Sequence, residues 1–335
     1  MGQERIYPFS YFWGGAAVLC LLGVVVLAGP YSADIAFIQN TEALWYYWQL
    51  PESTTWGFLS AWTGYLLHQV GNWWIIARAK RERRSYSRGL RPLNVAALAF
   101  NATFIILHVV QTRFWYDGLA QNFSPVVAQF SFIFLLVIVL IIENPRRGML
   151  FGRKAPIRQE IVDFLKRYHG YYFSLAIVFT FWFHPMELNW GHLLGFGYMF
   201  LLLMQGSLIF TVFHTNRRWT TLLEAFVLPH AMIVAYLSPK QGASAVAMFG
   251  FGFLTLFIVT QVYGLGLTRR TLAVLTALYL LLVAGYYWPD PMGALAVLRI
   301  PMVEYGIAFI IALLVWLGLL AYRRLAAPVR SPPQH

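Results

Sequence analysis

Long apolar runs, broken by charged or Pro/Gly-rich segments, dominate the pattern of this chain. A helix needs about 20 mostly apolar residues to cross a hydrocarbon core of about 30 Å, so runs of that length predict membrane-spanning helices. The predicted class is an all-α, polytopic integral membrane bundle of about ten transmembrane helices in residues 1–325, followed by a tail, residues 326–335. The predicted spans lie near residues 11–29, 55–77, 93–115, 125–142, 168–183, 190–213, 222–237, 244–264, 272–287 and 302–322.

The composition agrees with a bilayer environment. Of the 335 residues, 59% are hydrophobic and only 11% are charged, and the mean hydropathy is +0.59. So little polar side-chain surface cannot cover a water-soluble globule of this size. The sequence also predicts no separate soluble domain, because no long stretch between the apolar runs has a core of its own.

The basic residues predict the orientation of the bundle. Lys and Arg near the ends of spanning helices stay on the cytoplasmic side. With the N-terminus inside, all Lys and Arg fall in inner segments except Arg113, Lys240 and Arg299. This separation predicts an even number of spans with both termini cytoplasmic, in a bacterial inner (plasma) membrane. The net charge of +12 then reports orientation and contact with membrane lipids, and it predicts no nucleic-acid partner.

The longest predicted inner loop has an amphipathic stretch. Ile157, Ile161, Phe164 and Leu165 recur at helical spacing beside basic residues. This pattern predicts a short helix that lies on the membrane surface.

Histidines form the most unusual polar pattern within the predicted spans. A polar side chain in hydrocarbon is costly, so those that occur usually face the bundle interior and often mark function. The helix register predicts that five histidines reach the outer half of the bundle, and the outer hairpin HPMELNWGH adds a glutamate. These residues are His68, His108, His184, Glu187, His192 and His230.

Imidazoles beside a carboxylate predict a metal site. Neutral imidazole is a good ligand for zinc, iron or copper, and a carboxylate completes many such sites. Cys20 is the only cysteine, which excludes a cysteine-based site and an intramolecular disulfide. The first hypothesis is therefore a metal ion held by His108, His184 and His192, with Glu187 as a ligand or as the catalytic proton acceptor.

A b-type haem held by two histidines of different helices is the alternative cofactor. His68, His108 and His230 are the candidate cofactor-binding residues for it, beside an aromatic-lined pocket for a quinone or another lipophilic small molecule. Either cofactor would serve redox or hydrolytic chemistry on a lipophilic substrate. Arg113 is expected to contact an anionic group or a lipid headgroup.

Three other interpretations remain open. Each histidine alone could simply hydrogen-bond to a neighbouring helix, which is a structural role. The chain could instead be a non-catalytic subunit or an assembly factor of a larger complex, with other membrane subunits as its partners. Transport of a small solute is the third, although the two halves of the chain show no symmetry and the carboxylates lie near helix ends. Its candidate residues are Asn72, Asn101, Gln129, Gln205, Glu224, Gln261 and Glu304.

Overall fold

The computed structural model describes residues 5–30, 35–37, 49–82, 85–237 and 242–326; Lys240 and all of the predicted tail after Ala326 lie outside these ranges. The described chain is helical, and its only β-pairing consists of isolated bridges. The elements are α1 (Tyr11–Ala28), α2 (Thr55–Glu82), α3 (Pro92–Trp115), η2 (Leu119–Gln121), α4 (Pro125–Arg147), α5 (Gln159–Phe183), α6 (Trp190–Ser207), α7 (Arg217–Ala225), α8 (Val227–Leu237), α9 (Gly242–Val259), η3 (Gln261–Leu265), α10 (Arg269–Tyr286), η4 (Gly293–Leu298) and α11 (Arg299–Ala326).

The predicted all-α class is confirmed, and each predicted span falls on a helix. Among the described residues, six helical segments are long and apolar enough to cross a membrane. The other four predicted spans fall on α2, α5, α6 and α9. Of these, α6 packs against α1, α3, α5 and α8, and it buries polar groups such as His192 and Ser207. The six segments are Tyr11–Ala28, Pro92–Trp115, Pro125–Arg147, Arg217–Leu237, Arg269–Tyr286 and Gly293–Ala326.

Local side chains fix where several helices begin. The hydroxyl of Ser10 accepts a hydrogen bond from Trp13 at the start of α1, and Ser124 with Pro125 starts α4. Asn189 caps α6 by accepting from the backbone N–H of His192. Such oxygens satisfy the free N–H groups of a first helical turn.

Two predicted spans are wrong in their details. The sixth predicted span reaches residue 213, but α6 ends at Ser207 because the following loop pairs with the loop before α3, through Ser87 N–H to Phe210 O at 3.0 Å. The seventh consists of two helices, α7 and α8, which meet at Phe226. Pro229 lies in the first turn of α8, where its missing N–H costs no helical hydrogen bond.

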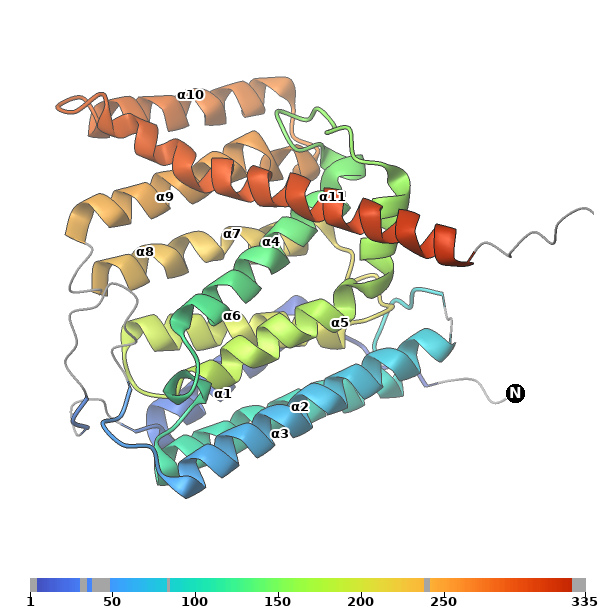
Figure 1. Cartoon of the computed structure of the whole chain (residues 1–335), viewed down its shortest axis with the longest axis vertical. Helices are drawn as coiled ribbons and strands as arrows, with labels where there is room; N and C mark the ends of the chain where they lie inside the picture. Colours follow the sequence, from blue (N-terminus) through green and yellow to red (C-terminus); the bar gives the residue numbers. More distant parts are fainter. Residues whose placement is uncertain (1–4, 31–34, 38–48, 83–84, 238–241, 327–335) are drawn as a thin grey trace, which may run out of the picture.

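The amphipathic stretch predicted as a separate surface helix is continuous with α5, which begins at Gln159. Ile161 and Leu165 are buried in a core cluster with α4 and α11, so their apolar face contacts protein. In Figure 1 the first part of α5 nevertheless runs at a steep angle to the rest of that helix.

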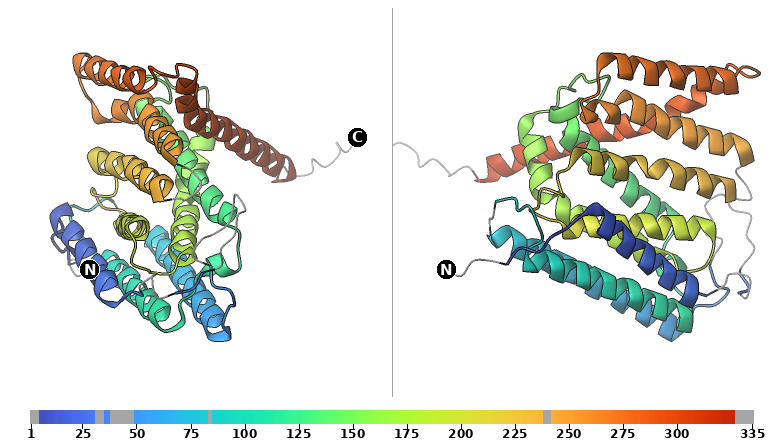
Figure 2. Two further views of the ribbon diagram at one scale, coloured as in Figure 1. Left: turned by 90° about the vertical axis from the view of Figure 1, so that its left-hand side faces the viewer. Right: turned by 180° about the vertical axis from the view of Figure 1, so that it is seen from behind.

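Most helices lie side by side and run across the longest axis of the molecule, and α4 and α11 cross the others obliquely (Figure 1). One part holds α1, α2, α3, α5 and α6, and the other holds α8 to α11, with α10 at the far edge (Figure 2). The helix α4 contacts α5 of the first part and α11 of the second, and α6 contacts α8, so these contacts join the two parts.

Several contacts mark the two ends of the bundle. At one end, Tyr7 pairs with Leu90, and Arg323 of α11 donates to Glu160 at 2.5 Å. At the other end, Gln49 donates to the carbonyl of Gln121 at 3.2 Å. The segments predicted to be inner and outer therefore gather at opposite ends.

Candidate functional site

Five of the predicted site residues lie near one another at the end of the bundle predicted to be outer. We call them the outer cluster. His108 comes from α3, His184 and Glu187 from the α5–α6 loop, His192 from α6 and His230 from α8. His108 and Glu187 are both 0% exposed. The HPMELNWGH hairpin therefore folds inward and places its polar side chains inside the protein.

Glu187 is the best-anchored member of the outer cluster. The hydroxyl of Tyr116 donates to one carboxylate oxygen, Oε2, and the side-chain amide of Asn189 donates to the other, Oε1. The Nδ1 atom of His192 lies 3.4 Å from Glu187 Oε1. Asn189 thus caps α6 and also orients the carboxylate towards an imidazole.

His184 links the members of the outer cluster. Its ring lies beside that of His192, with centroids 5.2 Å apart. Its backbone carbonyl accepts from His108 Nε2 at 2.9 Å. Burial, followed by the nearby charges of His192, His230 and His108, holds the pKa of His184 well below its usual range. The ring is therefore neutral at neutral pH, which is the form that binds metal ions.

His230 approaches α6 where that helix has no side chain. A Cβ atom at Gly195 would lie 2.9 Å from His230 Nε2, so glycine leaves room for the ring. Gly195 is three residues after His192, on the same side of α6.

His68 is buried next to the outer cluster but is not part of it, and both of its ring nitrogens have protein partners. Trp182 Nε1, which can only donate, lies 3.2 Å from His68 Nδ1, so His68 Nε2 carries the proton and donates to Asn101 Oδ1 at 2.8 Å. The ring of Trp182 also lies against that of His108, with centroids 4.2 Å apart.

The outer cluster fits a metal ion better than a haem. Two ligand atoms bonded at about 2.1 Å to a tetrahedral ion lie about 3.4 Å apart, which is the separation of His192 Nδ1 and Glu187 Oε1. Within the described ranges, however, no three His, Cys, Asp or Glu side chains are already close enough to hold a metal ion. A further imidazole would have to rotate to complete the ligand set.

Arg113, which the sequence predicts to contact an anionic group or a lipid headgroup, is exposed.

Aromatic side chains fill the space in which a haem would lie. Phe181 packs against the ring of His108 at a centroid distance of 5.0 Å, and Phe196 packs against His192 at 5.9 Å. The residues present therefore do not fit a haem without extensive repacking, since a porphyrin needs a broad flat slot.

Asp117 lies behind the outer cluster, in the loop after α3, and sequence analysis did not select it. It is 3% exposed, and its Oδ1 accepts from the Gly118 N–H at 2.6 Å. Its Oδ2 is buried without a hydrogen bond from any described residue. Burial raises the pKa of Asp117 to about 6, although the Gly118 hydrogen bond lowers it in part.

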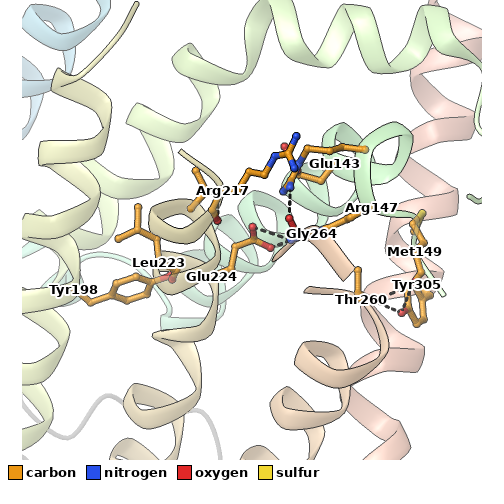
Figure 3. Close-up of polar contacts among 12 residues, drawn as sticks. Glu143, Arg147, Met149, Tyr198, Arg217, Leu223, Glu224, Thr260, Gly264 and Tyr305 are labelled. Atoms are coloured by element: carbon orange, nitrogen blue, oxygen red, sulfur yellow. Dashed lines mark hydrogen bonds and ion pairs between the residues drawn. The ribbon is translucent and has the colours of Figure 1, made fainter. Parts of the chain in front are cut away.

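A second polar site lies between the two parts of the bundle (Figure 3). Arg147 at the end of α4 donates from Nη1 to Glu224 Oε1 at 3.0 Å and from Nη2 to Oε2 at 2.5 Å. They line a narrow cleft together with Glu304 of α11, and Thr260 and Gln261 after α9. The cleft has room for about one water molecule.

Sequence analysis missed this arrangement because it grouped Arg147 with the exposed basic residues of an inner loop. The predicted fourth span ended at residue 142, whereas α4 continues through Pro145 to Arg147 and buries the guanidinium group. The residues after 142 read ENPRR, which are charged or polar and include a proline, so the sequence contains no signal that the helix continues.

Comparisons with known proteins assign neither site, since no family model, curated protein or solved structure matches this chain.

Proposed function

We propose that this chain is an integral membrane enzyme of the bacterial inner membrane, with about ten spans, cytoplasmic termini and one metal ion bound in the outer cluster. The observation that carries the proposal is the separation of 3.4 Å between His192 Nδ1 and Glu187 Oε1, with the His184 ring beside them. That separation matches two ligands of one tetrahedral ion.

The proposed ligands are His184, His192 and Glu187, with His230 as the fourth. Imidazole nitrogen and carboxylate oxygen together suit zinc, iron or copper. When bound, such an ion supplies Lewis-acid or redox chemistry to a lipophilic substrate that enters from the membrane.

The chain's own residues orient this site. Tyr116 and Asn189 hold the two oxygens of Glu187, so the carboxylate faces His192. His108 is fixed between the carbonyl of His184 and the side chain of Gln111, with Nδ1 2.9 Å from Gln111 Oε1. Outer-sphere partners of this kind fix the orientation of ligands and commonly change metal affinity about 10–100-fold when removed. We therefore place His108 next to the ligands, as a residue that positions the loop.

Elemental analysis of the purified protein tests the proposal. After purification without chelators and incubation with Zn²⁺, the native protein should retain about one metal ion per chain. His192→Ala and His184→Ala should each lose most of it. His169→Ala is the matched control, because His169 lies on α5 and bonds to the Lys166 carbonyl at 2.7 Å. A metal-free native protein, or equal retention in all four samples, would refute the proposal.

Labelling of single cysteines tests the membrane topology separately. With Cys20 replaced by serine, a cysteine at Ser85, an exposed position in the loop before α3, should react with an impermeant reagent only after cells are lysed. A cysteine at Asn122, on the opposite end of the bundle, should react in intact cells. The reverse pattern would contradict the proposed orientation.

A further inference from the structure

The cleft beside Arg147 contains a carboxyl group that has no partner among the described residues. Glu304 is 8% exposed and makes no hydrogen bond or ion pair with any residue in the described ranges. It lies on α11, within a segment apolar enough to span a membrane. An ionised carboxylate in such a place is costly unless a positive charge accompanies it.

Arg147 does not provide that positive charge to Glu304. Both of its Nη atoms are held by Glu224, and its Nε has no hydrogen-bond acceptor among the described residues. The Arg147–Glu224 pair is neutral as a unit. Glu304 therefore leaves the cleft with one negative charge when it is ionised.

A second oxygen in the cleft also has no hydrogen-bond partner in the part of the chain that the structure describes. The Oε1 atom of Gln261 is buried and accepts no hydrogen bond from a described residue. The hydroxyl of Thr260, nearby, donates to the Met149 carbonyl at 2.8 Å and contacts the Tyr305 hydroxyl at 2.7 Å, so its oxygen keeps a lone pair. A water molecule would satisfy the amide oxygen, but it would not neutralise the carboxylate.

From these contacts we infer that the cleft binds one small monovalent cation of the size of Na⁺, held by Glu304, Gln261 and Thr260. Carboxylate, amide and hydroxyl oxygens are the ligands that hard cations prefer. The charge of one such ion balances Glu304, and the cleft has room for about one water-sized particle. This site is separate from the outer cluster and does not depend on the function proposed for it.

Thermal unfolding of the full chain in detergent tests the inference. At constant pH and ionic strength, replacing choline chloride by NaCl should raise the unfolding midpoint of the native protein until the effect saturates, because the ion binds only the folded state. Glu304→Gln should unfold at a similar midpoint in choline chloride and lose the Na⁺-dependent shift. Glu143→Gln is the matched control, since Glu143 pairs with Arg146 on α4 outside the cleft lining.

Direct binding of ²²Na⁺ keeps the test decisive if Glu304→Gln fails to fold. The native protein should bind about one Na⁺ per chain, and Gln261→Leu should bind it at least several-fold more weakly. Absence of ²²Na⁺ binding, or a midpoint that depends on pH but not on Na⁺, would overturn the inference, because protonation of Glu304 would then replace cation binding.

Discussion

Arg147 and Glu224 form a two-point ion pair in which the guanidinium side chain is 1% exposed. The pair joins the end of α4 to the end of α7, at the boundary between the two parts of the bundle. Because Glu224 holds both Nη atoms of Arg147, Glu304 has no counter-charge among the described residues of the cleft. The charge balance at Glu304 therefore depends on the Arg147–Glu224 pair.

Removing one partner of this pair should be strongly destabilising. Arg147→Leu leaves Glu224 buried without its counter-charge, for which we expect a loss of about 3–5 kcal/mol in the free energy of unfolding. The double variant Arg147→Leu/Glu224→Leu should recover most of that loss. Reversible thermal or denaturant unfolding in detergent provides the comparison, and equal losses in the single and double variants would show that the loss does not come from the unpaired charge of Glu224.

His68 should behave as a structural residue. His68→Leu leaves the buried indole N–H of Trp182 without its acceptor and removes one of the two hydrogen bonds to Asn101 Oδ1, which should cost about 1–3 kcal/mol. The metal content should stay at the native value, because His68 is not one of the proposed ligands. Unfolding and elemental analysis of the same sample measure both effects. Loss of metal without loss of stability would show instead that His68 is a metal ligand.

Gly64 of α2 controls the position of Trp182. A Cβ atom there would lie 2.1 Å from the indole ring, so Gly64→Ala must displace that ring, which also contacts His108. We expect a loss of about 1–3 kcal/mol from this overpacking. Gly23→Ala is the control, because a Cβ atom at Gly23 meets nothing within 4 Å. It should be neutral or stabilising, since alanine has the higher helix propensity. Similar effects of the two substitutions in unfolding experiments would contradict the packing described.

Asp117 should make stability depend on pH in a defined direction. Its pKa is about 6 in the folded protein and 3.8 in a model compound, so the folded state binds more protons than the unfolded state between these values. The contribution of Asp117 is therefore fully present below pH 3.8 and is lost as the pH rises through about 6. Asp117→Asn should be more stable than the native protein above pH 6 and should lose that advantage towards pH 4. Thermal unfolding across this range measures the difference; a constant difference at all pH values would exclude Asp117 as its cause.

The helices were largely predictable because burial in a bilayer needs long apolar runs, and each of these runs became a helix. The sequence could also indicate that His184, Glu187 and His192 approach one another, since they share one short hairpin. The proximity of His230 could not be predicted, because it depends on how α8 packs against Gly195. Arg147 was misassigned for a related reason. Its charge counts equally towards orientation whether it faces water or a buried partner such as Glu224.

Titration of the purified, chelator-treated protein with Co²⁺, followed by visible absorption, tests the central claim most directly. The account predicts saturation at about one Co²⁺ per chain, with absorption bands typical of four- or five-coordinate nitrogen and oxygen ligands, and their loss in His192→Ala. Native protein that develops no such bands, or His192→Ala protein that develops them equally, would contradict a metal site in the outer cluster.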